Sequence, residues 1–286
     1  MLLSELIQTF VNLRQTWPQN WPGLPRVLAS ALRRLGQDPE RAVDARAEAL
    51  RVCAFEIAQS IESRSLHPAK KQAEPAYHNR LHFADVLVGL TALLLQTPER
   101  AQKTAQSWET AEKRADALTL PEWRAILTVI AHDWQHPGTI NQFPAQIESF
   151  TVAQLRPMMH RSGVAVEDQD VVAQLILNTD PRCVKDAHAA IQNQPFDLSH
   201  LACMTVLIQE ADILASATPQ IGPGLTEQLA LEWQAHSPEM AASLRTPQGR
   251  LNFLRFGALF NSAPSLQLGL DKMVSEQIQA LTAGSF

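Results

Sequence analysis

Apolar side chains recur three and four residues apart along most of this chain, and this spacing constrains its fold more than any other feature. Leu3, Leu6, Ile7 and Phe10 begin the pattern, and it returns in later segments such as 266–281. Such spacing places apolar side chains on one face of an α-helix. The alternation typical of half-buried strands is scarce, and the chain has only 11 glycines and one tyrosine. We therefore predict an all-α, multi-helix bundle.

Length and charge limit the kinds of partner that such a bundle can have. The chain has 286 residues, 45% of them hydrophobic, and a net charge of −5. It can bury a sizeable core, which excludes a fully disordered chain. The acidic balance gives no support to a nucleic-acid polymer as partner, because such partners usually need a basic face. A small phosphate ester is compatible with it, since bound metal ions can supply positive charge locally.

The cysteines and the N-terminus bear on the compartment. Cys53, Cys183 and Cys203 form no CxxC pair, so we expect reduced thiols. The first residues lack the basic region of a signal peptide. No apolar run approaches the roughly 18 residues that a membrane span needs. We expect a cytoplasmic protein without a membrane partner.

Breaks in the helical pattern suggest how the chain is organised. Trp17-Pro18 and Trp21-Pro22-Gly23 are expected to interrupt the first helix. Asp38-Pro39-Glu40 has the order of a cap, a first-turn proline and a first-turn acid. We expect residues 1–64 to form N-terminal helices that pack on, or extend, a catalytic unit of residues 65–286. Their expected role is that of a scaffold or a dimerisation surface, so a homodimer is one assembly that the sequence allows.

Candidate metal ligands cluster where one apolar helical run ends. His132 and Asp133 are adjacent, His136 follows, and Pro137-Gly138 then breaks the helix. Neighbouring residues lie about 100° apart around a helix, so both side chains can reach one ion at a helix end. Imidazole with carboxylate suits Zn, Mn or Fe, and a carboxylate oxygen can be shared with a harder ion such as Mg. The alternative is a surface or capping pair without a metal.

Two other segments supply further candidates. His78 and His82 lie one turn apart on the same side of a predicted helix. They could bind one ion together, or one could ligate while the other transfers protons, or both could simply face water. Asp212 lies in an apolar stretch, and burying an acid there is costly without a cation or strong hydrogen bonds. The alternative for Asp212 is an exposed position beside Glu210.

Taken in order, Tyr77-His78-Asn79-x-x-His82, His132-Asp133-x-x-His136-Pro137-Gly138 and Asp212 resemble the motifs of the HD superfamily. Most closely, the chain looks like the catalytic domain of the class I cyclic-nucleotide phosphodiesterases. The resemblance covers roughly residues 77 to 256. It implies an HD-domain, phosphodiesterase-like helical bundle with a two-metal site at its centre.

The resemblance also implies a role for each matching residue. The ligands of a first ion, which would be Zn, Fe or Mn, match His82, His132, Asp133 and Asp212. Asp133 would also touch a second ion, Mg or Mn, held otherwise largely by water. His78 matches the proton donor to the leaving oxygen, and His136 and Glu148 match residues that hold metal-bound waters. The positions that match the substrate pocket are Tyr77, Thr179, Asp180, Arg250 and Phe253.

These parts imply a metal-dependent phosphohydrolase. Two ions about 3.5–4 Å apart would lower the pKa of a bridging water and neutralise the charge of a phosphate. The hydroxide would attack phosphorus while His78 protonates the departing oxygen, a task that suits a histidine near neutral pH. The first candidate substrate is a cyclic nucleotide or a related small phosphodiester.

One departure from the family concerns the substrate. The purine-reading Gln of the family, three residues before a Phe, aligns with Arg250 before Phe253. Arg cannot offer the donor and acceptor edge of Gln, although it could bind a second phosphate or a carboxylate, or be a surface charge. The alternatives that stay open are a nucleotide phosphomonoesterase, an HD-type di-iron oxygenase, and a non-catalytic HD domain that binds a ligand without turnover.

Overall fold

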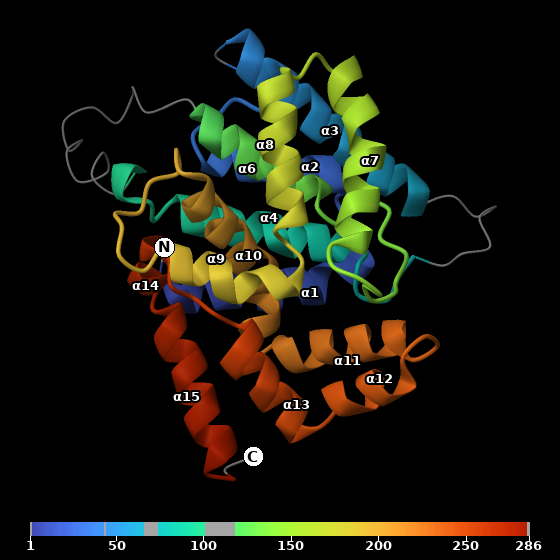
Figure 1. Cartoon of the computed structure of the whole chain (residues 1–286), viewed down its shortest axis with the longest axis vertical. Helices are drawn as coiled ribbons and strands as arrows, with labels where there is room; N and C mark the ends of the chain where they lie inside the picture. Colours follow the sequence, from blue (N-terminus) through green and yellow to red (C-terminus); the bar gives the residue numbers. More distant parts are fainter. Residues whose placement is uncertain (1, 43, 66–73, 101–117, 285–286) are drawn as a thin grey trace.

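The computed structural model describes residues 2–42, 44–65, 74–100 and 118–284, and within these ranges the chain is helical and has no strand (Figure 1). The helices of the first half are α1 (Leu3–Asn20), α2 (Leu24–Arg34), α3 (Ala45–Ser65), α4 (Arg80–Leu94), α6 (Leu120–Ala131) and α7 (Gln146–Arg161). Those of the second half are α8 (Val166–Leu177), α9 (Val184–Ala190), α10 (Leu201–Ala217), α11 (Gly222–Trp233), α12 (Pro238–Leu244), α13 (Pro247–Asn252), α14 (Ala263–Leu268) and α15 (Leu270–Thr282). A short 3₁₀ turn (Pro181–Cys183) precedes α9, and a π-helical turn (Phe253–Gly257) follows α13. The all-α prediction is confirmed.

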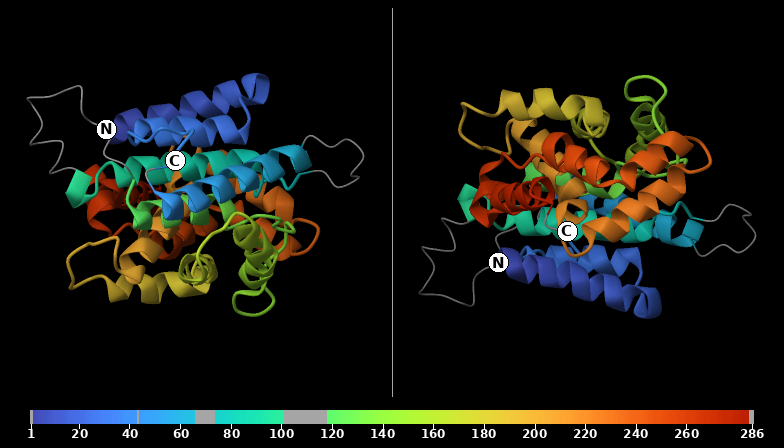
Figure 2. Two further views of the ribbon diagram at one scale, coloured as in Figure 1. Left: turned by 90° about the horizontal axis from the view of Figure 1, so that it is seen from above. Right: turned by 90° about the horizontal axis from the view of Figure 1, so that it is seen from below.

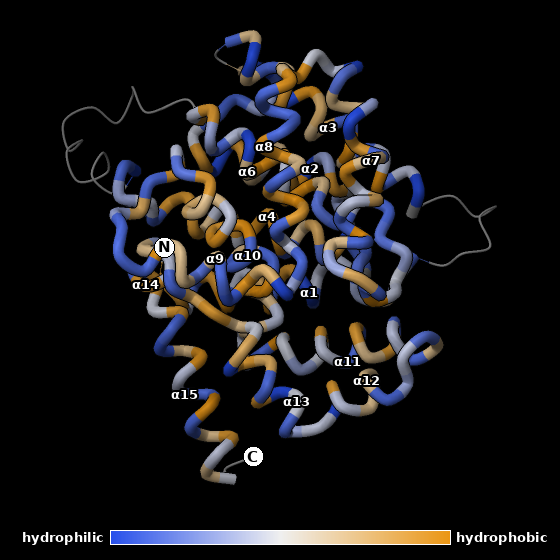
Figure 3. Tube along the Cα trace, viewed as in Figure 1, coloured by the Kyte–Doolittle hydropathy of each residue, from blue (hydrophilic) through white to orange (hydrophobic). Residues whose placement is uncertain are grey.

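Helix α4 lies at the centre of the molecule. Nearly all of its side chains from His82 to Leu94 are buried, and a helix that is apolar on all sides belongs in a core. The hydropathy of the chain shows the same arrangement, with the most hydrophobic stretches gathered along α4, α6 and α10 (Figure 3). One continuous core cluster extends from Leu6 to Val274, so the histidine at the start of α4 lies at the edge of the main core.

Helices α1 and α2 form a layer across one side of α4 (Figure 2). Arg14 of α1 makes a buried ion pair with Asp85 of α4, one turn after His82. A buried charge needs such a partner, because its desolvation is costly. The N-terminal helices therefore contact the helix that carries the first histidines of the candidate site.

Two local predictions in this layer are wrong. Trp17-Pro18 does not end α1, which continues to Asn20; Trp17 is buried and packs edge-to-face against Trp21, and this contact holds the last turn. Asp38 does not cap α3, because its carboxylate accepts a hydrogen bond from the nearby backbone N–H of Glu40. The carboxylate of Asp44 accepts the N–H groups of Arg46 and Ala47 at the start of α3 instead.

Helix α10 packs directly against α4, and a glycine allows their close approach. A Cβ added at Gly89 of α4 would lie 3.0 Å from the carbonyl oxygen of Ala211 on α10. Backbones come this near only where no side chain separates them. The contact places Asp212, the next residue on α10, near the beginning of α4.

The C-terminal helices α11, α12, α13 and α15 form a separate group below α10 in the view of Figure 1. Glu210 of α10 helps to hold the chain that follows α13. Its buried carboxylate accepts hydrogen bonds from the backbone of Asn261 and Ser262 and from the hydroxyls of Ser262 and Ser265. Glu210 therefore has a structural role, and it does not share a solvent-facing stripe with Asp212.

No single helix among the described residues is both long and apolar enough to cross a membrane. By length and composition alone, α10 and α11 together would pass the same test, but they meet at a bend of 101°.

Candidate metal centre

The cap of α4 positions the first histidine of the site. The side-chain oxygen of Asn79 accepts hydrogen bonds from the backbone N–H groups of Leu81 (2.9 Å) and His82 (3.4 Å). An Asn at this position satisfies the free donors of a helix start. His82 thus lies in the first turn of α4, and its side chain is buried.

The end of α6 positions the second histidine and the first acid. The Nδ1 atom of His132 lies 2.9 Å from the carbonyl oxygen of Val129, so Nδ1 carries the proton that it donates. This contact leaves Nε2 as a ligand atom, as in many metal-bound histidines. Asp133 follows directly, at the start of the turn that ends α6.

Four ligand atoms from two helix ends, the start of α4 and the end of α6, and from the interior of α10 converge on one point. Asp133 Oδ2 lies 3.2 Å from His82 Nε2 and 3.0 Å from His132 Nε2. Asp212 Oδ1 lies 3.2 Å and 3.4 Å from the same two nitrogens. Ligands bound at about 2.1 Å in tetrahedral or octahedral geometry are separated by roughly 3.0–3.4 Å. The four residues therefore match the spacing of a shared cation.

The electrostatics of the cluster favour a positive charge at its centre. Burial alone would lower the pKa of His82, but the contacts with Asp133 and Asp212 raise it to about 9. His132 shows the same balance, and its pKa is raised well above the ordinary value. Burial would raise the pKa of the two acids, but His132 and His82 keep both pKa values low. Carboxylates that favour protons on both imidazoles would also favour a metal ion between them.

Unsatisfied atoms give a second indication of metal binding. The Nε2 atoms of His82 and His132 are buried and have no hydrogen-bond partner in the part of the chain that the structure describes, although carboxylate oxygens lie nearby. Buried polar atoms are rarely left unpaired. Two imidazoles and two carboxylates are also a common donor set for Zn, Fe or Mn. His82, His132, Asp133 and Asp212 therefore fit a divalent ion.

His78 lies beside this cluster and is held by an acid that the sequence analysis missed. Its Nδ1 lies 2.5 Å from Glu232 Oε1, and its Nε2 lies 3.8 Å from Asp133 Oδ2. Glu232 Oε2 also accepts the backbone N–H groups of Tyr77 (2.7 Å) and His78 (2.9 Å). Burial raises the pKa of Glu232, but the contact with His78 keeps it below the ordinary value. Glu232 is thus a carboxylate that accepts a hydrogen bond from Nδ1 of His78. The other ring nitrogen of His78, Nε2, faces the candidate ligand Asp133.

The turn after Asp133 makes room for Glu232. Gly138 has a φ of +74°, and a Cβ there would lie 3.3 Å from Cγ of Glu232. Gln135 also has a positive φ of 66°, which is uncommon for a residue with a side chain. The Pro-Gly break therefore shapes the wall of the site as well as ending the helix.

His136 stacks on His78, with ring centroids 3.7 Å apart. Its Nδ1 accepts a hydrogen bond from the backbone N–H of Gly138 at 3.0 Å, so the ring proton resides on Nε2. Burial, followed by the neighbouring His78, lowers the pKa of His136 to about 3. His136 is thus a neutral histidine next to the four clustered ligand residues. Its contact with a metal-bound water stays a prediction.

Glu148 and Asp180 meet on another side of the site through Asn141. The Nδ2 atom of Asn141 lies 2.9 Å from Glu148 Oε2 and 3.4 Å from Asp180 Oδ2. Burial, and to a lesser extent Asp180 and Asp133, raises the pKa of Glu148. Asp180 accepts the backbone N–H of Ala145 at 2.6 Å. These acids add negative charge near Asp133.

Three other residues predicted to line a substrate pocket have structural contacts. The Tyr77 hydroxyl lies 2.9 Å from the Ser216 hydroxyl, and the Tyr77 ring lies 4.8 Å from the ring of His82. The hydroxyl of Thr179 donates to the carbonyl of Ile176 at 2.7 Å. Phe253 starts the π-helical turn and has the guanidinium of Arg250 5.4 Å from its ring centre.

Arg250 is engaged by the end of α10. Its Nη1 donates to the carbonyl oxygen of Ser216 at 2.6 Å, and its Nη2 lies within 3.3 Å of the carbonyl oxygens of Ala217 and Thr218. Nη2 also donates to the side chain of Gln277 at 2.8 Å. A cation at a helix C-terminus satisfies the last carbonyls and complements the helix dipole. Both terminal nitrogens of the Arg250 guanidinium are thus engaged by the protein itself.

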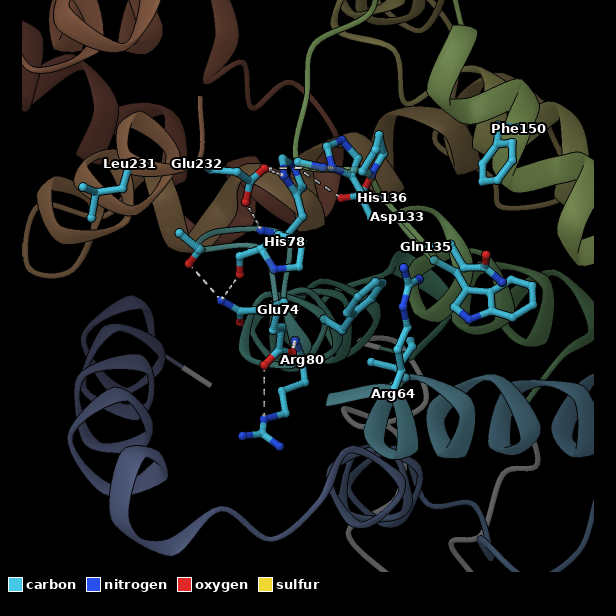
Figure 4. A pocket seen from close by; sticks show the side chains of 18 of the residues that line it. Arg64, Glu74, His78, Arg80, Asp133, Gln135, His136, Phe150, Leu231 and Glu232 are labelled. Atoms are coloured by element: carbon cyan, nitrogen blue, oxygen red, sulfur yellow. Dashed lines mark hydrogen bonds and ion pairs between the residues drawn. The ribbon is translucent and has the colours of Figure 1, made fainter. Parts of the chain in front are cut away.

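A cavity of about 540 Å³ lies beside the cluster. Figure 4 shows His78, His136, Asp133 and Glu232 together on its wall, with Arg64 reaching towards Gln135 from below. The described residues that line the cavity include His78, Asp133, His136 and Glu232, but neither Arg250 nor Phe253. The open space next to the cluster thus lies away from the position where the family reads a purine.

The comparison with solved structures agrees with this geometry. The structure of LmjPDEB1, a Leishmania phosphodiesterase, in complex with IBMX aligns with 91% of this chain and 84% of its own, with a TM-score of 0.60 and 13% identity. The chain has the phosphodiesterase fold. No family model and no curated protein matches the sequence. The predicted fold is thus confirmed.

Proposed function

We propose that this protein is a metal-dependent phosphoric ester hydrolase of the phosphodiesterase type. The observation that carries the proposal is the convergence of His82, His132, Asp133 and Asp212 within 4.8 Å of one another, directly beside the His78–Glu232 pair. A metal site alone would fit many functions. A metal site with an adjacent, oriented histidine, in a phosphodiesterase fold, fits hydrolysis of a small phosphodiester best, either a cyclic nucleotide or a related ester.

The first ion would be held by the four clustered residues and would be Zn, Fe or Mn. The second, Mg or Mn, would lie on the side of Asp133 that faces Glu148 and Asp180, because the negative charge there favours a hard cation. When bound, divalent ions activate water near neutral pH and neutralise phosphate charge. The resulting prediction is a site with two ions that share Asp133.

His78 would act as the general acid. Glu232 fixes its ring with Nδ1–H directed at the carboxylate, so Nε2 is directed at the position where substrate must lie. A proton on Nε2 would pass to the leaving oxygen as the ester bond breaks, which avoids the release of an unprotonated alkoxide. The stacked ring of His136 limits the rotation of His78 and helps to keep this geometry.

The test is turnover by the purified protein loaded with Mn or Mg. Bis(p-nitrophenyl) phosphate, cAMP, cGMP and AMP would separate a diesterase from a nucleotide monoesterase and from a domain that only binds. We expect hydrolysis of at least one diester. Loaded protein that hydrolyses none of these esters would contradict the proposal.

His78→Gln tests the general acid separately from the metal site. We expect kcat to fall by about 10²–10⁴-fold, the usual contribution of a positioned acid or base, while metal content measured by mass spectrometry stays the same. The matched control is His160→Gln, since His160 is exposed on α7. If His78→Gln lost the metal or kept the rate, the assigned role would be wrong.

A further inference from the structure

The cavity beside the metal centre has the size of a small-molecule site. Its volume of about 540 Å³ lies within the roughly 300–1,000 Å³ that such sites span. Its described lining comes from the end of α3, residues 74–79 and the start of α4, residues 133–138, α7, and the end of α11 with His236. A substrate whose phosphate reaches Asp133 and His78 would therefore extend towards α3 and α7.

The two arginines that line this cavity differ in their engagement. Arg80 lies near Glu62 (3.3 Å) and Glu74 (3.7 Å), and its guanidinium lies 5.6 Å from the ring centre of Trp21. Arg64, at the end of α3, is exposed and makes no hydrogen bond or ion pair with the residues that the structure describes. Its side chain extends towards Gln135 on the cavity wall (Figure 4). Among the described residues, Arg80 is paired with acids and Arg64 is not.

Apolar side chains flank the same cavity. Phe150 and Leu231 are 49% and 55% exposed, yet both belong to its lining. They lie on opposite sides of the catalytic residues in Figure 4. Large apolar groups left in water gain free energy when a ligand covers them, so they suit the organic part of a substrate.

We propose that Arg64 is a specificity-determining residue that binds a second phosphate of the substrate, with Phe150 in contact with the organic group between the two phosphates. This inference rests on the proposed function and names its substrate class. The planar guanidinium can bind phosphate with two parallel hydrogen bonds. The substrate is then an acyclic phosphodiester with an additional terminal phosphate, and the second anion is bound at Arg64 because Arg250 is engaged by α10.

The charge of the substrate separates this class from cyclic nucleotides. A 3′,5′-cyclic nucleotide carries one negative charge, which the metal centre would neutralise, and leaves nothing for Arg64 to bind. The dinucleotide ApA likewise has one phosphodiester, whereas its 5′-phosphorylated form pApA adds a terminal phosphate on the same scaffold. The pair therefore isolates the contribution of the second anion.

The kinetic test compares kcat/KM for pApA and ApA, with bis(p-nitrophenyl) phosphate as a general diester. We expect the wild type to prefer pApA by about 10-fold, which corresponds to about 1.4 kcal/mol. Arg64→Gln should reduce this preference to less than about 2-fold, and Arg64→Lys should retain part of it, since Lys keeps the charge but not the fork. Arg33→Gln, at an exposed arginine of α2 outside the cavity, should keep the full preference.

A binding test works without turnover. Titration calorimetry of the metal-loaded protein would compare adenosine 3′,5′-bisphosphate with AMP. We expect the bisphosphate to bind about 10-fold tighter to the wild type and equally to Arg64→Gln. Phe150→Ala should weaken both ligands by about 5-fold, whereas Phe143→Ala, at another exposed aromatic residue, should not.

The outcomes distinguish the two proposals. Hydrolysis of diesters without a preference for pApA, or a preference that survives Arg64→Gln, overturns the Arg64 inference and leaves the proposed function intact. No hydrolysis of any ester, together with bisphosphate affinity that depends on Arg64, overturns the function and supports the anion site. Equal binding of AMP and the bisphosphate to the wild type overturns the site in either case.

Discussion

His82 and His188 are both buried, with 3% and 2% of their surfaces exposed, but their surroundings give them opposite chemistry. Two carboxylates lie within 3.2 Å of His82 Nε2, and its pKa rises to about 9. Neither ring nitrogen of His188 on α9 has a hydrogen-bond partner among the described residues, and burial lowers its pKa to about 4. Both have unsatisfied nitrogens, so an unpaired atom alone does not identify a metal ligand. The carboxylates around His82 make the difference.

The comparison explains why the candidate site is where it is. Burial disfavours a charged imidazole, as His188 shows, and only nearby negative charge reverses this preference. At His82 and His132 the acids Asp133 and Asp212 come from different helices, and they meet because α10 and α6 both pack against α4. The fold thus concentrates carboxylates around His82 and His132, whereas burial is the cause of the lowered pKa of His188.

Asp212→Asn tests the comparison with the largest expected effect. With metal at about 1,000 times its dissociation constant, binding should stabilise the wild type by about 4 kcal/mol. The variant loses one anionic ligand, so this stabilisation should vanish at the same metal concentration. Urea unfolding with and without Mn or Zn measures it.

His188→Leu is the control for the metal experiment. It removes a buried histidine without removing a carboxylate, so the stabilisation by metal should equal that of the wild type. If Asp212→Asn kept the response, or if His188→Leu lost it, the four-residue centre would not be the metal site.

His188 also predicts how stability depends on pH. Its pKa is about 4 in the folded protein and about 6.5 in the unfolded chain. Between these values the unfolded chain binds more protons, so stability falls as pH decreases from 6.5 to 4. A shift of this size corresponds to a loss on the order of 3 kcal/mol.

Urea unfolding of the metal-free protein at pH 7, 5.5 and 4 measures this effect. His188→Leu should lose about 3 kcal/mol less than the wild type over this range, because leucine has no proton to bind. His160→Gln, at an exposed histidine, should follow the wild type. Identical pH profiles for His188→Leu and the wild type would contradict the assignment.

The sequence predicted the parts of the fold that depend on local pattern. Helical spacing predicted the all-α class, and the structure confirms it within the described residues. Prediction from the sequence failed where tertiary contacts decide, as at Trp17-Pro18, where packing against Trp21 continues the helix, and at Asp38, where a local turn takes the carboxylate. Local helix propensity predicts poorly where packing or a competing hydrogen bond contributes a similar free energy.

The candidate site was predictable to the extent that its residues stand in motifs. His82, His132 and Asp133 belong to short motifs, and Asp212 is an acid in an apolar stretch. Glu232 belongs to none of these motifs. The related sequence feature is Gly138, because a side chain at that position would crowd Glu232. The contacts of Arg250 with α10 depend on how α13 packs, which no local pattern encodes. Residues whose contacts lie far away in the sequence therefore cannot be predicted from local spacing.

Glu232→Gln extends the comparison to His78, whose Nδ1 contacts one carboxylate, and its expected effect is the smallest. Gln can still accept the Nδ1 proton of His78, but it supplies no negative charge and places an amide where Oε2 accepts two backbone N–H groups. We expect kcat to fall by about 10-fold, less than for His78→Gln, because the acid itself remains. Metal content should not change, since Glu232 is not among the four clustered ligands.

Glu227→Gln is the matched control, because Glu227 lies on the same helix and pairs only with the exposed Arg245 among the described residues. An equal loss of rate in both variants would show that damage to α11, and not the orientation of His78, is responsible.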